Sequence, residues 1–138
     1  MARPTKASRI ETLRSIETFA GLPVKSLEAI HKVAGEIEVS AGEVLIQPRT
    51  QGSGMFIIEE GTAVVERKGT TIDLGPGQCF GELSLLTAYP HTARVRAKTA
   101  LKCLTINRFD FLKLLESEPK MAVSMLEMLA GRFAKSMD

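Results

Sequence analysis

The sequence is poor in the residues that build metal centres, disulfide frameworks and nucleophilic active sites. It has two cysteines and two histidines among 138 residues. Cys79 and Cys103 form neither a CxxC pair nor a cysteine–histidine cluster, which argues against a metal site. His31 and His91 support no Ser/His/Asp arrangement, and no GxxxxGK[ST] phosphate loop occurs. We therefore expect no bound metal and no enzymatic activity.

Long apolar segments and a strong charge excess are also absent. The chain has no signal peptide and no apolar run of roughly 18 residues, so we expect a reduced cytoplasmic location and no membrane span. Eighteen basic and 16 acidic residues give a formal net charge of +2, which neither requires nor excludes nucleic acid. The length and the 44% apolar content suffice for one core. We expect residues 1–138 to form a single domain.

Two kinds of apolar periodicity divide the chain. Residues 8–20 place apolar side chains three apart, and Pro23 suits the first turn of a second short helix. From Glu36 to Ile106 the period becomes two, with glycine-containing turns between β-rich runs. These runs are residues 44–46, 56–58, 63–65, 71–72, 95–97 and 101–106. Short strands at this spacing predict an antiparallel sandwich or barrel.

The helical period returns after Ile106. Asn107, with Asp110 three positions later, is typical of a helix N-cap. A last helix is expected at about residues 119–136. Its apolar residues form two neighbouring stripes, the first of Ala122, Leu126, Leu129 and Phe133 and the second of Met121, Met125 and Met128. An apolar arc of this width suits a helix that closes over a ligand, a dimer seam or deep core packing.

The segment 77–86 carries the clearest functional signal. Gly81, Glu82 and Ser84 stand where an irregular segment becomes an apolar helical stretch, expected at 81–87. Unpaired N–H groups at a helix start can hold an anion. A carboxylate in the same turn would repel a phosphate and suits a sugar hydroxyl instead. The combination indicates a ligand with a phosphate and a ribose close together.

The order of these features resembles the cyclic nucleotide-binding domain. This domain occurs in bacterial catabolite-type regulators, cyclic-nucleotide-gated channels and the regulatory subunits of cyclic-nucleotide-dependent kinases. The resemblance extends over about residues 14–134, with landmarks at 19–22 (FAGL), 41–45 (AGEVL), 57–61 (IIEEG), 74–77 (LGPG) and 80–83 (FGEL). It implies a mainly β fold with flanking helices, in which an antiparallel double-stranded β-helix or jelly roll lies between N-terminal and C-terminal helices.

The resemblance also implies a ligand site, a phosphate-binding cassette from Gly81 to about Ala97 that follows Phe80. Glu82 would accept a hydrogen bond from the ribose 2′-hydroxyl, and backbone N–H groups around Leu83 and Ser84 would hold the cyclic phosphate. The ligand would be cAMP or cGMP, and no further cofactor is required. Glu82 could instead be a first-turn carboxylate favoured by the helix dipole, and Ser84 a solvent-facing helix residue.

One position departs from the family pattern. The family usually has Pro-Arg-Ser/Thr/Ala-Ala-x-Val at the end of the cassette, whereas residues 90–95 read PHTARV. His91 therefore replaces the arginine that pairs with the phosphate. A guanidinium is always charged and binds two oxygens at once, whereas an ordinary histidine is mostly neutral at pH 7. The site is then a weakened phosphate contact, a site retuned to another ligand, or a pocket without a ligand.

The residues after His91 leave further alternatives open. By the resemblance Thr92 would contact the phosphate or a guanine base; it is otherwise a plain strand residue and does not separate cAMP from cGMP. Arg94 and Arg96 share the strand face of Thr92, opposite His91. Because strand starts are often irregular, this parity does not exclude Arg94 as a phosphate partner.

Two functions follow. The first is a stand-alone cyclic nucleotide sensor whose last helix folds over the base, with Met125, Leu129 or Arg132 near it, and thereby changes what the methionine-rich face binds. The second is an interaction or dimerisation module with a degenerate or retuned pocket, which binds an unidentified protein or a second copy through the C-terminal helix. Catabolite-type regulators carry a helix-turn-helix domain after this helix. The sequence up to Asp138 contains no such domain, so direct DNA binding is not expected.

Overall fold

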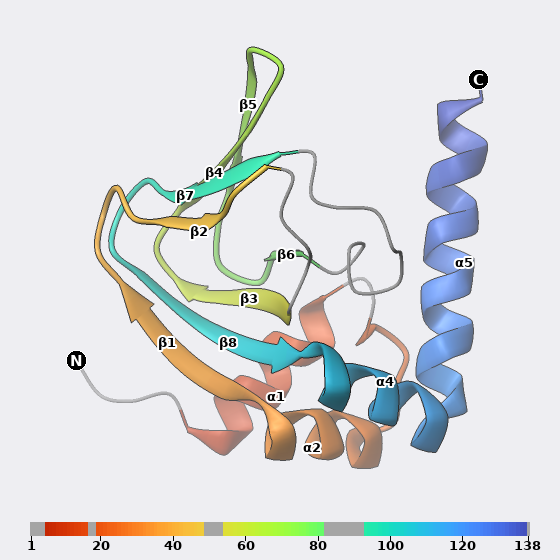
Figure 1. Cartoon of the computed structure of the whole chain (residues 1–138). Helices are drawn as coiled ribbons and strands as arrows, with labels where there is room; N and C mark the ends of the chain where they lie inside the picture. Colours follow the sequence, from red (N-terminus) through yellow and green to blue (C-terminus); the bar gives the residue numbers. More distant parts are fainter. Residues whose placement is uncertain (1–4, 17–18, 49–53, 82–92, 138) are drawn as a thin grey trace. The chain divides into compact units, whose positions relative to one another are not determined.

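The computed structural model describes residues 5–16, 19–48, 54–81 and 93–137. They divide into two compact units (Figure 1), a β unit within Ala34–Phe111 and a helical unit made of Met1–Val33 and Leu112–Asp138. The helices are α1 (Lys6–Ser15), α2 (Val24–Val33), α4 (Arg108–Ser117) and α5 (Pro119–Ser136). The strands are β1 (Gly35–Val39), β2 (Val44–Ile46), β3 (Gly54–Glu60), β4 (Ala63–Arg67), β5 (Thr70–Leu74), β6 (Cys79–Phe80), β7 (Arg94–Ala97) and β8 (Leu101–Asn107).

The β unit consists of two four-stranded antiparallel sheets. One sheet has the order β1-β8-β3-β6 and the other has the order β2-β7-β4-β5. The chain crosses repeatedly from one sheet to the other, so neighbours in a sheet are mostly distant in sequence. The β4–β5 hairpin projects beyond the rest of the unit (Figure 1). The predicted mainly β, antiparallel fold class with flanking helices is confirmed.

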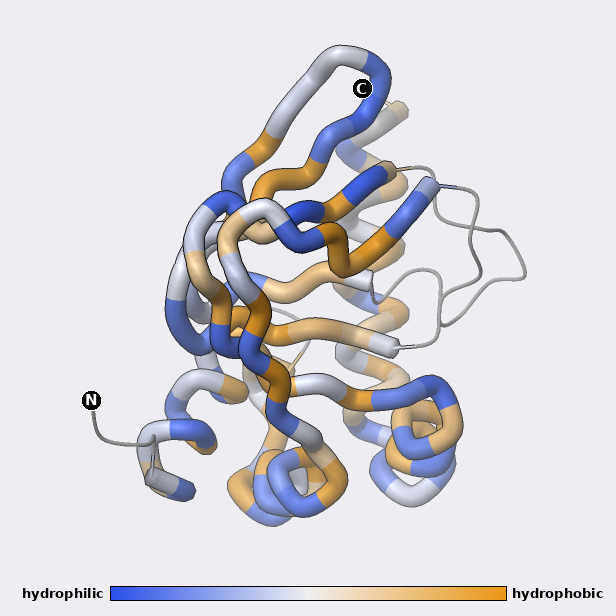
Figure 2. Tube along the Cα trace, turned by 60° about the vertical axis from the view of Figure 1, so that its left-hand side comes forward, coloured by the Kyte–Doolittle hydropathy of each residue, from blue (hydrophilic) through white to orange (hydrophobic). Residues whose placement is uncertain are grey.

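One apolar core lies between the two sheets. Both sheets contribute side chains to it: Ile58, Phe80, Leu101 and Cys103 from one, and Ile46, Ala63, Val95 and Ala97 from the other. Polar and apolar positions alternate along the strands (Figure 2), as a strand with one buried face requires. The predicted period of two therefore corresponds to strands with one face in the core. All six predicted runs lie in strands: 44–46, 56–58, 63–65, 71–72, 95–97 and 101–106.

The helical unit has its own buried apolar residues. They include Leu13 of α1, Leu27 and Ile30 of α2, and Met121 and Met125 of α5. The Thr5 hydroxyl caps α1 by accepting a hydrogen bond from the Ser8 N–H at 3.1 Å. No helix in the described part of the chain is both long and apolar enough to cross a membrane.

Two helix boundaries test the sequence reasoning. The first helix ends at Ser15 rather than at residue 20, because Ile16 adopts an extended conformation and its N–H returns to the Leu13 carbonyl. The N-cap predicted at Asn107 is confirmed. Its side-chain oxygen accepts the Asp110 N–H at 2.8 Å, and its amide nitrogen donates to the Asp110 carboxylate at 3.0 Å. A reciprocal pair of this kind specifies where α4 begins.

Cys103 is a core residue and its thiol is chemically protected. Burial, with a smaller contribution from the charge of Glu59, raises the pKa of Cys103 from 9.0 to about 11. Only the thiolate reacts with alkylating and disulfide reagents, and a shift of this size lowers its population about a hundredfold at pH 8.

We expect Cys103 in a Cys79→Ser variant to resist a maleimide at pH 8 while the protein is folded. It should react at the rate of a free thiol in concentrated guanidinium chloride. The measurement is a time course of mass spectra. Labelling of the native protein at the denatured rate would show that Cys103 is not held in the core.

Candidate ligand-binding site

Residues 75–78, which precede the predicted cassette, are held in place by backbone hydrogen bonds to β3. The Gly77 N–H donates to the Ile58 carbonyl and the Ile58 N–H donates to the Gln78 carbonyl, both at 2.9 Å. The Gln78 side chain folds back and accepts the Gly75 N–H at 2.8 Å. Residues 75–78 therefore form a rigid turn that delivers the chain to β6, a two-residue strand that the sequence patterns did not predict.

Phe80 ends this approach inside the core. Its side chain is 5% exposed. Its ring stacks on that of Phe56 with a centroid separation of 5.0 Å and an interplanar angle of 11°, and the two residues are paired in register across β3 and β6. Stacked aromatic pairs add to the energy of burial. The side chain of Phe80 thus anchors the segment, and its predicted contact with a ligand stays a prediction.

Gly81 stands where the chain leaves β6, and only glycine fits there. Its φ is +89°, and a Cβ atom at this position would lie 2.7 Å from the carbonyl oxygen of Gly54. Both the left-handed backbone and the close approach of β3 exclude a side chain. The glycine that the sequence singled out for its place before a helix start therefore has a packing reason of its own.

The far side of the cassette begins at β7, whose two faces differ in chemistry. Val95 and Ala97 are buried. Arg96 points to the other face and its guanidinium pairs with Glu66 at 3.2 Å, while Arg94, exposed, is aligned with Glu66 on β4. The strand parity used above holds across β7, so Arg94 lies on the outer face, away from the core.

Ile46 connects the two ends of the predicted cassette. It is paired in register with Val95 of β7, and its Cδ1 atom lies 3.5 Å from where a Cβ of Gly81 would be. The β2–β7 register shifts between Val44 and Ile46, so Val44 is 40% exposed and Ile46 only 6% exposed. A β-bulge reverses the face of the next side chain, and strict alternation from Val44 would have assigned Ile46 to the wrong face. Sequence reasoning missed this residue.

Five of the predicted site residues lie outside the described residues: Glu82, Leu83, Ser84, His91 and Thr92. The helical stretch expected at 81–87 lies mostly there as well. Their roles toward phosphate and ribose stay predictions. The structure describes the frame on both sides of them, from Phe80 and Gly81 to the start of β7.

The two predicted apolar stripes of the C-terminal helix α5 differ in burial. Met121, Met125 and Met128 are buried at 0%, 2% and 8% exposure, so these methionines are core residues of the helical unit. The methionine-rich face is therefore covered in this structure, and the predicted change in what it binds after a ligand-driven shift of the helix stays a prediction. Leu126 and Phe133 of the other stripe are 66% and 67% exposed. The side chain of Arg132, predicted near the base, lies outside what the structure describes.

Metal-ligating groups do not gather among the described residues, where no set of three or more His, Cys, Asp or Glu side chains could hold an ion. Neither Cys79 nor Cys103 is part of a disulfide. They stand on β6 and β8, which β3 separates in the sheet. The two thiols therefore have no disulfide geometry.

These features define a class of protein. Two antiparallel sheets enclose a core, and one residue of β2 holds both ends of a segment with a glycine at its entry. This is the frame of a β-roll ligand-binding domain. Residues 36–118 match the model of the cyclic nucleotide-binding domain, and the chain belongs to that family, as its sequence landmarks predicted.

Curated relatives of this chain include channels and kinase subunits. A cyclic nucleotide-gated potassium channel of Mesorhizobium japonicum is 36% identical over 84 residues, which cover 61% of this chain and 23% of the channel. A cAMP-dependent protein kinase regulatory subunit of Blastocladiella emersonii is 37% identical over 94 residues, which cover 62% of this chain and 23% of the subunit. The chain thus spans about a quarter of the length of these relatives.

Solved structures share the fold over most of the chain. The N-terminal domain of a transcriptional regulator from Streptomyces coelicolor A3(2) superposes with a TM-score of 0.79 and 27% identity, covering 92% of both chains. The regulatory domain of Toxoplasma gondii PKA in complex with cAMP gives 0.75 and 25% identity, covering 83% of this chain and 46% of that one. The Thermus thermophilus catabolite activator protein superposes with a TM-score of 0.78 and 24% identity, covering 87% of this chain and 59% of that one. At this identity the likeness supports the fold alone.

We expect a Gly81→Ala variant to be destabilised by about 2 kcal/mol or more, because the new methyl group meets the Gly54 carbonyl in a backbone conformation that only glycine adopts without strain. Gly42→Ala is the matched control. Gly42 has a φ of +91°, but a Cβ there would meet no atom within 4 Å, so strain alone should cost about 1 kcal/mol. Urea unfolding of both variants measures the difference, and equal costs would contradict the proposed close contact at Gly81.

Proposed function

We propose that the chain is a sensor module for a cyclic nucleotide, cAMP or cGMP. The observation that carries this proposal is the convergence of both ends of the cassette on Ile46, within the residues that match the family model. A cassette held at both ends is suited to present backbone N–H groups from a fixed position. The cAMP complex of the Toxoplasma gondii domain is a structural neighbour and supports the choice of ligand class.

In the proposed mechanism the cyclic phosphate lies against the backbone N–H groups of Gly81 to Ser84, at a helix start. Glu82 accepts a hydrogen bond from the ribose 2′-hydroxyl. The C-terminal helix α5 responds to the bound base through the half-buried Leu129, and a ligand moves this helix only by binding one of its positions better than another. The module binds its ligand without converting it and needs neither a metal nor a second cofactor.

The phosphate charge is the weak point of this site. Arg96 is paired with Glu66, and Arg94 lies on the same outer face of β7. We propose that neither supplies the charge that the family arginine would supply, and that compensation falls to the backbone N–H groups and to His91. Loss of one charged partner costs roughly 2 kcal/mol, which is more than tenfold in affinity. We therefore propose a sensor of moderate affinity.

Calorimetric titration with cAMP and with cGMP tests the proposal. Saturable heat at micromolar nucleotide, reduced by Glu82→Gln, supports a sensor. Arg94→Gln is the matched control, because it changes a polar side chain on the outer face of β7 and should leave the affinity unchanged. No binding at millimolar nucleotide by a protein with an intact thermal transition would overturn the sensor function.

We expect His91→Arg to bind cyclic nucleotide about tenfold more tightly, because a permanent guanidinium replaces a mostly neutral imidazole. The wild-type affinity should rise as the pH falls from about 7.5 to 6, since the imidazolium is the better phosphate partner. The affinity of the variant should not change over that range. A wild-type profile that is flat with pH, together with an unchanged variant affinity, would show that residue 91 does not contact the phosphate.

A second function, dimerisation through α5, is favoured by a separate observation. Residues 123, 126, 130, 133 and 137 repeat at alternating intervals of three and four, and all are exposed: Val123, Leu126, Ala130, Phe133 and Met137. The four large ones are 52% to 72% exposed. This spacing is that of the a and d positions of a coiled coil. We propose that this row, here called the α5 seam, binds the same helix of a second copy.

We expect Leu126→Glu combined with Phe133→Glu to convert a dimer into a monomer, because two charges would face each other in an apolar seam. Lys120→Glu combined with Lys135→Glu is the control on the same helix, with exposed lysines outside the seam. Sedimentation velocity measures the change. A wild-type protein that stays monomeric at high micromolar concentration would refute the seam as a self-association surface.

A further inference from the structure

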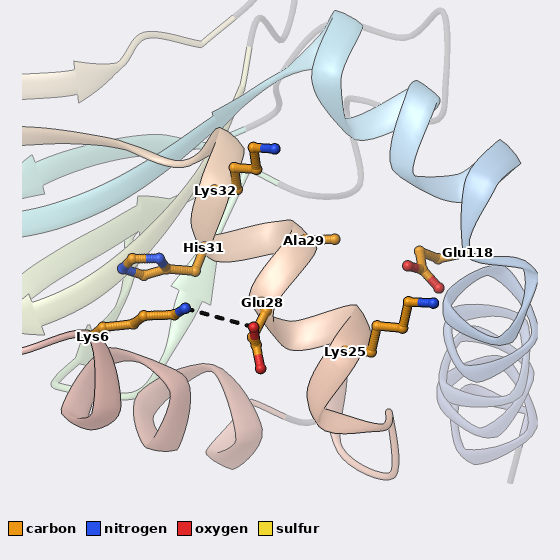
Figure 3. A pocket seen from close by; sticks show the side chains of 7 residues that line it. All are labelled: Lys6, Lys25, Glu28, Ala29, His31, Lys32 and Glu118. Carbon is orange, nitrogen blue, oxygen red and sulfur yellow. Dashed lines mark ion pairs between the residues drawn. The ribbon is translucent and has the colours of Figure 1, made fainter.

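The helical unit contains a hollow of about 530 Å³ that is distinct from the predicted nucleotide site. Figure 3 shows it over the exposed side of α2, with side chains of α1 and of the residue before α5 around it. Its lining residues are Lys6, Lys25, Glu28, Ala29, His31, Lys32 and Glu118. Every lining residue except Ala29 carries a charged or titratable side chain.

The two carboxylates of the hollow are already engaged. Glu28 forms an ion pair with Lys6 of α1, with 3.6 Å between Nζ and Oε2 (Figure 3). Glu118 accepts a hydrogen bond from the Ser26 hydroxyl at 2.9 Å, and Ser26 is itself only 2% exposed. Because a buried hydroxyl needs this acceptor, the Glu118 carboxylate is held in place.

The remaining basic groups keep their donors available. Within the part of the chain that the structure describes, the side chains of Lys25, Lys32 and His31 form neither an ion pair nor a hydrogen bond. Both lysines are exposed and His31 is half-buried. The hollow therefore offers two free ammonium groups beside the small side chain of Ala29, where a longer residue would fill the space, whereas His31 points away from Ala29 (Figure 3).

We propose that this hollow docks an acidic segment of a partner protein. Lys25 and Lys32 are seven positions apart on one face of α2, which separates them by about 10.5 Å along the helix axis. Three residues of a polyproline II segment cover nearly the same distance, at about 3.1 Å each, and every third side chain of such a segment lies on the same side. A segment with carboxylates at every third position matches the two lysines, and its backbone lies over Ala29.

The two engaged carboxylates favour a peptide over a continuous anionic surface. Glu28 and Glu118 stand among the lysines and would repel the closely spaced phosphates of a nucleic acid or a lipid bilayer. A peptide can place neutral residues opposite them and carboxylates opposite the lysines. Exposed ion pairs are individually weak and sensitive to salt, so the docking is a low-affinity contact that depends on several pairs at once.

The test uses the whole chain and a labelled, unstructured peptide with glutamate at every third position, measured by fluorescence anisotropy at low salt. We expect saturable binding that weakens as salt is added, and none with glutamine in place of glutamate. Lys25→Glu with Lys32→Glu should weaken binding about tenfold or more. The milder pair Lys25→Gln with Lys32→Gln should have an intermediate effect, and melting curves establish that each variant is folded.

The matched control is Arg67→Glu with Lys135→Glu, which removes the same charge from exposed positions on β4 and α5. Retained binding in this control locates the peptide at the hollow. An equal loss in both pairs would overturn the proposal in favour of a general charge effect. Binding to anionic phospholipid vesicles or to RNA that depends on Lys25 and Lys32, without binding to the peptide, would also overturn it and assign the hollow to that other partner.

Discussion

The candidate site depends on the close approach of two backbone segments. One is Gly81, the residue after β6, and the other is Gly54, the first residue of β3. A side chain at residue 81 would collide with the Gly54 carbonyl, so the absence of a Cβ lets the chain turn out of the sheet directly against β3. Ile46 lies beside this crossing and is also paired with Val95. Packing therefore fixes the described residues on both sides of 82–92, and the predicted ligand contacts depend on the residues between them.

Both arginines of β7, Arg94 and Arg96, lie on the outer face of the strand. Arg96 is bound to Glu66 on the outer face, and the inner face carries Val95 and Ala97. An apolar inner face makes an unpaired ligand phosphate expensive to bury. The proposed sensor therefore relies on backbone N–H groups, which are fixed by the fold and need no charge, more than relatives with an arginine in the cassette would.

The α5 helix combines two surfaces with different roles. Its methionines belong to the core of the helical unit, while the α5 seam is exposed along the same helix. A helix whose apolar residues occupy two faces can hold its own unit together with one and bind a second chain with the other. The acidic-segment hollow on α2 is a third surface of the helical unit, and it differs from the α5 seam because charge rather than apolar area would select its partner.

The family, the fold class, the N-cap at Asn107 and the turn at Gly81 could be predicted from the sequence, because turn chemistry, apolar period and short motifs are local properties of the chain. Three other features depend on contacts between distant segments. Ile46 faces the core because a bulge in the β2–β7 pairing changes its side, and no local pattern records which strand will be the partner. The methionine stripe of α5 is buried, whereas Leu126 and Phe133 of the other stripe are exposed, and two equally apolar stripes cannot be ranked without knowing their neighbours. Among the described residues, no side chain pairs with Lys25 or Lys32, while the nearby Glu28 and Glu118 are engaged with Lys6 and Ser26.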